Sequence, residues 1–174
     1  MAESISVLIS EDDVDKRIKE IGAQISKDYE GKDVHLICVL KGGSFFLCEL
    51  AKRITVPVSL DFMSCSSYGA DTKSSGIVKI VKDLDDPIKN KHVIVVEDIV
   101  DSGRTLSYLL DMLGKREPAS IKLCTLLDKP DRRVVPVNVD YTCFKVPDEF
   151  VVGYGLDYDQ KYRNLPYIGV VHLN

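Results

Sequence analysis

The chain has 174 residues, the size of one ordinary domain, and we expect a single domain over residues 1–174. A formal net charge of -4 argues against a general binder of nucleic acid or of anionic membranes, because both partners require an excess of basic side chains. No apolar run approaches the ~20 residues that cross a bilayer, and the start of the chain has no basic region followed by an apolar one. We therefore expect a cytoplasmic protein that binds neither nucleic acid nor membrane.

The five cysteines predict free thiols. Their number is odd, no C-x-x-C motif occurs, and Cys38 and Cys124 lie inside apolar runs. This pattern favours buried thiols in a reducing compartment over a disulfide framework.

The first predicted element is an amphipathic helix. Ser10 is a favourable N-cap, and the acidic residues at 11–13 suit the positive end of a helix. Apolar residues then recur at spacings of three and four, which is the helical period. They are Val14, Ile18, Ile21, Ile25 and Tyr29.

The rest of the chain alternates between predicted strands and helices. Apolar runs predict strands at 34–40, 58–62, 77–81, 92–96, 121–127, 150–152 and 168–171, and helices at 45–54 and 106–113. Short connections between strand, helix and strand indicate an α/β fold with a largely parallel central sheet. Ligands of such sheets bind at the carboxyl ends of the strands. The polar segment 64–76 is long for a loop and is a candidate lid over a site there.

Residues 95–106 (VVEDIVDSGRTL) carry the strongest functional signal. An apolar strand leads into Glu97 and Asp98, and Asp101 follows. Carboxylates this close repel one another, so a positive or hydroxyl-rich partner should offset the repulsion. Two adjacent carboxylates can accept hydrogen bonds from the cis-diol of a ribose and can help to hold Mg²⁺.

The residues that follow have the properties of a phosphate site. Ser102–Thr105 supplies successive backbone N–H groups, two hydroxyls and the start of a helix, and Gly103 lets the backbone approach a ligand closely. A solvated acidic turn with a capping Asp101 or Ser102 is the alternative. The ordered combination directly after an apolar strand favours the ligand site.

This segment resembles the signature of the type I phosphoribosyltransferases. The resemblance implies a mostly parallel sheet flanked by helices, with a small hood formed by the N- and C-terminal segments. It implies that Glu97 and Asp98 contact the ribose hydroxyls and Mg²⁺. It also implies that Asp101 is the general base near purine N7 and that the loop holds the 5′-phosphate through Asp101, Ser102, Gly103, Arg104 and Thr105.

Two flanking motifs resemble the hypoxanthine-guanine phosphoribosyltransferases within that family. Taken alone, Lys41-Gly42 is a glycine turn with a surface lysine, and Lys129 is a solvated lysine after a strand. The resemblance makes Lys41 and Gly42 part of the pyrophosphate loop, with a cis peptide between Leu40 and Lys41. It makes Lys129 a donor to purine O6, which selects 6-oxopurines over adenine because an ammonium group has donors only.

The segment 150–163 is similar to the 6-oxopurine enzymes almost residue for residue, although core packing alone would also explain an apolar strand followed by a glycine bend. The resemblance implies that Phe150 stacks on the base and that Val151 and Asp157 read its edge. Asp157 also helps to hold a second Mg²⁺, and Arg163 contacts pyrophosphate. Ser67 and Tyr68 belong to the family's mobile loop and complete the set of pyrophosphate-binding residues.

The implied activity is the transfer of a phosphoribosyl group from phosphoribosyl pyrophosphate to hypoxanthine or guanine, giving IMP or GMP in a homodimer or homotetramer. A xanthine-preferring relative, a non-catalytic ligand sensor and a receiver-type signalling domain are the alternatives. The sensor would be expected to lose a residue such as Asp101 or Lys41, and a receiver would carry acids after its first strand. The preference among the three bases stays open.

Overall fold

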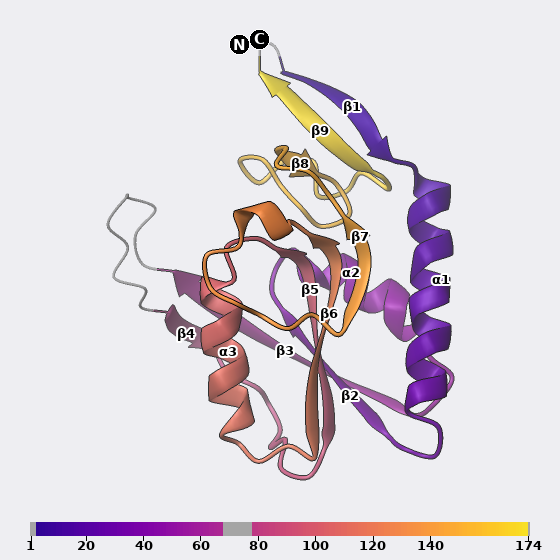
Figure 1. Cartoon of the computed structure of the whole chain (residues 1–174), viewed down its shortest axis with the longest axis vertical. Helices are drawn as coiled ribbons and strands as arrows, with labels where there is room; N and C mark the ends of the chain where they lie inside the picture. The colour runs from indigo at the N-terminus through magenta and orange to yellow at the C-terminus, as the bar shows by residue number, and fades with distance from the viewer. Residues whose placement is uncertain (1–2, 68–77, 174) are drawn as a thin grey trace.

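The computed structural model describes residues 3–67 and 78–173 and contains a six-stranded central sheet (Figure 1). All neighbouring strands are parallel except β3 and β4, which are antiparallel. The predicted α/β class with a mostly parallel sheet is therefore confirmed. In spatial order the strands are β4 (Val78–Lys82), β3 (Val58–Ser67), β2 (Val34–Val39), β5 (His92–Val100), β6 (Ser120–Asp128) and β7 (Tyr141–Lys145).

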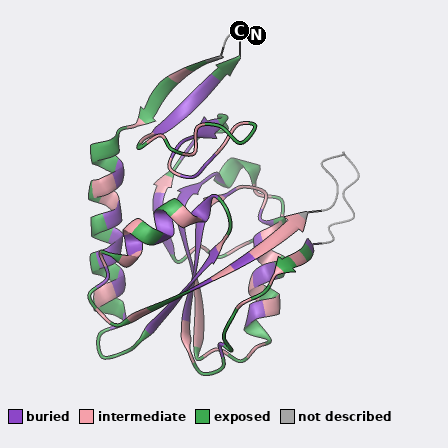
Figure 2. Cartoon of the chain, turned by 180° about the vertical axis from the view of Figure 1, so that it is seen from behind, coloured by how far each residue is buried: buried purple, intermediate pink, exposed green. Residues whose placement is uncertain are grey.

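Helices cover both faces of this sheet. α1 (Glu11–Asp28) and α2 (Gly43–Ala51) pack on one face, and α3 (Arg104–Gly114) packs on the other, so that two separate apolar clusters form. The inward faces of the helices are buried and the outward faces are exposed (Figure 2). A short 3-10 helix, η1 (Pro130–Arg132), follows β6.

A second, three-stranded antiparallel sheet forms the hood. It contains β1 (Glu3–Ile9), β9 (Ile168–Leu173) and β8 (Val151–Val152), and both ends of the chain lie there (Figure 1). The hood stands above one edge of the central sheet (Figure 1).

The predicted first helix is confirmed at its start and along its buried face. The Ser10 hydroxyl accepts a hydrogen bond from the Asp13 N–H at 3.2 Å. The five apolar residues predicted to face the core are all buried. No helix in the described part of the chain combines the length and apolar character that a membrane span requires.

Several predicted boundaries were wrong. β5 continues through the acidic pair to Val100, and β3 includes residues 64–67, which the sequence assigned to a loop. Both strands keep backbone pairing beyond the point where their side chains turn polar. α2 ends at Ala51, before Ile54.

Strands β1 and β7 were not predicted. β7 has only two fully buried residues, Tyr141 and Cys143, which is too short an alternation to identify a strand. Val7 of β1 is exposed, and the strand forms because it pairs with β9 more than 150 residues away in the chain, which local patterns cannot reveal.

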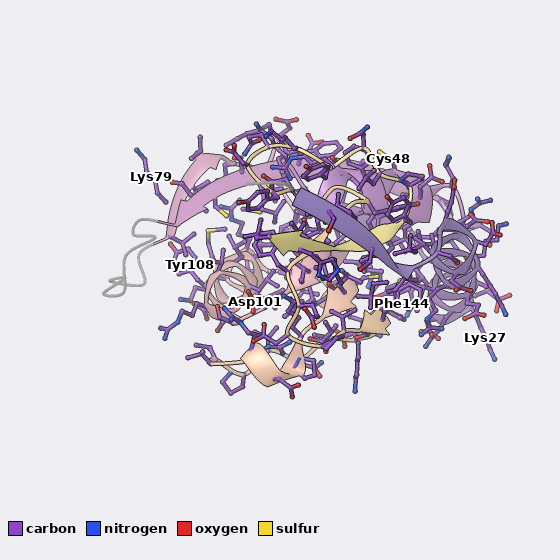
Figure 3. The ribbon with its side chains drawn as sticks, turned by 90° about the horizontal axis from the view of Figure 1, so that it is seen from above. Lys27, Cys48, Lys79, Asp101, Tyr108 and Phe144 are labelled. Atoms are coloured by element: carbon purple, nitrogen blue, oxygen red, sulfur yellow. The ribbon has the colours of Figure 1, made fainter. Side chains whose placement is uncertain are left out.

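We expect one fast-reacting thiol in the folded protein. All five cysteines are free. Burial raises the pKa of Cys38 and of Cys143 to about 12, and burial also raises the pKa of Cys65 and Cys124, so these thiols are poor nucleophiles near neutral pH. Cys48 is exposed on α2 and lies at the rim of the molecule in Figure 3.

Titration with an aromatic disulfide reagent at pH 8 should give one rapid equivalent that Cys48→Ser removes. In denaturant all five thiols should react. Fewer than five under denaturing, non-reducing conditions would indicate a disulfide and would contradict the assignment.

Candidate active site

The site lies where parallel strands end next to one another. β2 is followed by Lys41, β5 carries Glu97 and Asp98 near its end, and β6 is followed by Lys129. Since β2, β5 and β6 are parallel neighbours, their carboxyl ends share one edge of the sheet. The sheet thus brings together residues that are far apart in the sequence.

Of the acidic pair near the end of β5, Glu97 is buried and Asp98 is partly buried, and neither belongs to a described ion pair. Glu97 is 8% exposed. Burial and the negative charge of Asp98 raise the pKa of Glu97 well above its ordinary value. Burial also raises the pKa of Asp98, although the Ile99 N–H, which donates to Asp98 Oδ1 at 2.7 Å, and the charge of Arg163 oppose the rise.

These two carboxylates fit Mg²⁺. This ion typically takes one or two carboxylates from a protein, and waters and substrate phosphates complete its shell. A divalent cation would offset the charge that burial makes unfavourable at Glu97 and Asp98. Ribose hydroxyls, which donate to carboxylates, would act in the same direction.

The loop after β5 encloses a cavity of about 210 Å³. Gly103 has φ +82°, a left-handed conformation that favours glycine, and precedes the first turn of α3. At the start of α3 the Arg104 N–H donates to the Ser102 hydroxyl at 3.4 Å, and helix N-termini of this kind can bind anions through their backbone N–H groups. The lining includes Glu97 from the strand and Asp101, Ser102, Gly103 and Thr105 from the loop and helix.

Asp101 lies beside α3 when the molecule is viewed from the hood (Figure 3). Its Oδ1 accepts a hydrogen bond from Arg132 Nε at 3.1 Å, and Arg132 Nη1 lies 3.6 Å from Asp148 Oδ2. Arg132 therefore connects the loop after β5 to the segment that precedes Phe150. Sequence reasoning missed this arginine because the contact joins residues 31 apart.

The Lys41 loop packs tightly against Asp98 and the hood. The peptide between Leu40 and Lys41 is cis, as the resemblance implied. A Cβ on Gly42 would overlap Asp98 Oδ2, and a Cβ on Gly155, which has φ +98°, would overlap Gly42 O. Only glycine at these two positions allows the backbone to come this close. The close approach places the Lys41 loop in contact with Asp98 and with the 153–157 turn.

Lys129 contacts the residue that directly precedes Phe150. Lys129 is 8% exposed, and its Nζ donates to the Glu149 carbonyl oxygen at 2.6 Å. The Phe150 ring is half exposed and meets Tyr158 edge-on, with ring centroids 5.4 Å apart. The exposed face of Phe150 is available for stacking, and Val151 follows in β8.

Asp157 and Arg163 pair with each other. Arg163 Nη2 lies 3.0 Å from Asp157 Oδ1, and Nη1 donates to Gly155 O at 2.7 Å. Gln160 Oε1 accepts hydrogen bonds from Arg163 at 3.3 Å and from Lys41 at 3.5 Å. Gln160, which the sequence did not single out, thus lies between the two cations predicted to bind pyrophosphate.

Two predicted residues lie at or beyond the boundary of the described residues. The backbone of Ser67 ends β3 at the same sheet edge, but its side chain is outside the described part of the chain. Tyr68 lies entirely outside it, as does most of the predicted lid.

A larger cavity, about 560 Å³, does not coincide with this site. It lies between α1, α2 and residues 154–166, and its lining includes Glu11, Asp15 and Glu49 but no lysine or arginine. An acidic lining disfavours a phosphate-rich ligand, so the smaller cavity at the strand ends fits the predicted chemistry better.

Comparison with known proteins agrees with this architecture. The phosphoribosyl transferase domain model matches residues 10–159. The hypoxanthine-guanine phosphoribosyltransferase of Streptococcus thermophilus is 54% identical over 165 residues, covering 95% of this chain and 92% of that protein.

Solved structures agree as well. A hypoxanthine phosphoribosyltransferase from Staphylococcus aureus has a TM-score of 0.93 and 48% identity, covering 96% of this chain and 91% of that chain. A hypoxanthine-guanine phosphoribosyltransferase from Bacillus anthracis has a TM-score of 0.91 and 46% identity, covering 98% of this chain and 100% of that chain. On these matches, this chain belongs to the phosphoribosyltransferase family, in the group of the hypoxanthine-guanine phosphoribosyltransferases.

Proposed function

We propose that this protein converts hypoxanthine or guanine, with phosphoribosyl pyrophosphate, to IMP or GMP and pyrophosphate in purine salvage. The proposal rests mainly on one observation. A carboxylate pair with one buried member, an amide-rich loop and a lysine near an exposed aromatic ring meet at one sheet edge. These groups match the sugar, the phosphate and the base of a nucleoside monophosphate.

The sugar phosphate binds along the end of β5. Glu97 and Asp98 accept hydrogen bonds from the ribose 2′- and 3′-hydroxyls. The N–H groups and hydroxyls of residues 102–105 hold the 5′-phosphate at the start of α3, and Arg104 adds positive charge.

Glu97, Asp98 and Asp157 would hold Mg²⁺ beside the substrate. A divalent ion held there would supply positive charge near the leaving pyrophosphate. Asp157 is paired with Arg163 in the free chain, so binding of pyrophosphate and metal requires this ion pair to separate. Arg163 and Lys41 then face the pyrophosphate oxygens, with Gly42, Ser67 and Tyr68 as the remaining contacts.

The purine stacks on Phe150, with O6 toward Lys129. The Lys129 ammonium donates to O6 of a 6-oxopurine, whereas adenine presents an amino group that cannot accept. Backbone groups of Val151 and of the turn at Asp157 read the opposite edge. These contacts suit any 6-oxopurine, so xanthine is the main alternative to hypoxanthine and guanine.

Bond formation joins purine N9 to C1′ of the sugar as the C1′–pyrophosphate bond breaks, with inversion at C1′. The transition state is oxocarbenium-like, so the enzyme acts mainly through electrostatic stabilisation. Asp101 accepts the N7 proton during nucleotide formation and returns it in the reverse reaction.

The cellular setting and assembly are part of the same proposal. Free buried thiols and the absence of a membrane-spanning helix in the described residues support a cytoplasmic enzyme. The family resemblance supports a homodimer or homotetramer that binds neither nucleic acid nor membrane.

A steady-state assay with each base, phosphoribosyl pyrophosphate and Mg²⁺ tests the function. We expect hypoxanthine and guanine to be converted, adenine to be rejected, and turnover to stop when a chelator removes Mg²⁺. No reaction with any 6-oxopurine would overturn the proposal.

Asp101→Asn should lower kcat by ~10²–10⁴-fold, because the amide cannot accept the N7 proton. The substituted side chain keeps its shape and can still accept from Arg132, so calorimetry should show nearly unchanged binding of phosphoribosyl pyrophosphate. Asp111→Asn, an exposed change on α3, is the matched control. Undiminished turnover in Asp101→Asn would remove Asp101 from its role.

Lys129→Gln should lower kcat/KM for hypoxanthine by about 10–100-fold, since a hydrogen bond to a charged group contributes roughly 1.5–3 kcal/mol. The discrimination between hypoxanthine and adenine should also decrease, because glutamine can both donate and accept. Lys115→Gln on the surface of α3 controls for loss of a positive charge. An unaltered base preference would show that Lys129 does not read O6.

A further inference from the structure

Arg133 lies beneath the loop that carries Asp101. Its Nε donates to the Asp101 carbonyl oxygen at 3.1 Å, and its Nη1 donates to Val137 O at 3.4 Å. Its Nη2 forms a close ion pair with Asp128, and the two side chains are only 18% and 10% exposed. One guanidinium group thus contacts two backbone carbonyl oxygens and one carboxylate.

The ion pair extends to the predicted base-reading lysine. Asp128 is the last residue of β6 and directly precedes Lys129. The Lys129 N–H in turn donates to the Val100 carbonyl oxygen at 3.0 Å, next to Asp101. Arg133 therefore ties the end of β5 to the end of β6 at the two positions where Asp101 and Lys129 emerge.

The residues after Arg133 support the rest of the same loop. The N–H groups of Val134 and Val135 donate to Ser102 O at 2.9 and 3.0 Å. A Cβ on Gly103 would overlap Val135 O and would come within 2.9 Å of Arg133 Cδ. The loop consequently rests on residues 133–135, and Arg133 is the side chain that fixes this support to the sheet.

The chemistry of the base explains why this connection matters. N7 and O6 of a 6-oxopurine lie on the same edge of the ring system. In the proposed function Asp101 addresses N7 and Lys129 addresses O6, so the two side chains must keep a fixed separation. Misplacement of a catalytic group by about 1 Å can lower a rate by about 10²-fold.

We infer that Arg133 is a positioning residue that holds Asp101 and Lys129 in register on the N7–O6 edge of the purine. The inference rests on the proposed function. A planar guanidinium with several fixed donors suits the task, because it can bind a carboxylate and two carbonyl oxygens at once. A lysine could pair with Asp128 but could not keep the other contacts.

Arg133→Lys separates positioning from a simple contribution to stability. The lysine keeps a positive charge near Asp128, so we expect its Tm to lie close to that of the parent protein. Turnover with hypoxanthine should nevertheless fall by at least about fivefold, because the contact with the Asp101 carbonyl is lost. Parent-like kcat in Arg133→Lys would overturn the inference.

Arg133→Gln should lower kcat by about 10–100-fold in the parent protein and by a clearly smaller factor in the Asp101→Asn background, where only its effect on Lys129 remains. Such non-additivity is expected if Arg133 acts in part through Asp101. A decrease in kcat by the same factor in the parent protein and in the Asp101→Asn background would contradict the inference. Should the single variant fail to fold, Asp128→Asn/Arg133→Gln removes both charges, leaves no unpaired ion and undergoes the same test.

Arg116→Gln is the matched control. Arg116 also uses two guanidinium nitrogens to bind a carboxylate, that of Asp83, but it lies just past the opposite end of α3. We expect kcat to be unchanged in this variant. If the parent protein converts no 6-oxopurine, the proposed function fails; if it does and Arg133→Lys is normal, only the role of Arg133 fails.

Discussion

Parallel pairing of β2 with β5 and of β5 with β6 is the constraint on which the site depends. The register places Cys38 beside Val96 and Val96 beside Cys124, so the three strands reach the same sheet edge together. Residues that lie tens of positions apart are thereby brought to one edge of the sheet. Helices on both faces bury the strands, which leaves the carboxyl ends and their loops as the place where polar groups can gather.

Glu97 and Asp98 lie near the end of β5, where desolvation makes their negative charge unfavourable, and this affects which ligands the site can bind. Desolvation raises the pKa of both Glu97 and Asp98, and the charge of Asp98 adds to the rise at Glu97. A bound cation and the hydroxyl groups of a substrate would offset this unfavourable negative charge. The free site is therefore suited to a hydroxyl-bearing ligand that binds together with a cation. Arg163 is paired with Asp157 and contacts Gln160, and in the proposed function pyrophosphate replaces these partners.

The sequence predicted those parts of the protein whose information is local. The helix that starts at Ser10, the apolar strands and the glycine-containing loop after Asp101 each have a short-range pattern. β1, β7, Arg132 and Arg133 were missed because their partners are distant in the chain, as with the contact between Arg133 and Asp101. The strand ends were misjudged because backbone pairing continues under polar side chains, as at Glu97.

A crystal structure of the protein with IMP and Mg²⁺ tests the central claim most directly. The account predicts the phosphate on the N–H groups of residues 102–105, the ribose hydroxyls on Glu97 and Asp98, and the base on Phe150 with O6 at Lys129. A nucleotide bound in the cavity between α1 and α2, with the carboxyl ends of β2, β5 and β6 unoccupied, would contradict it.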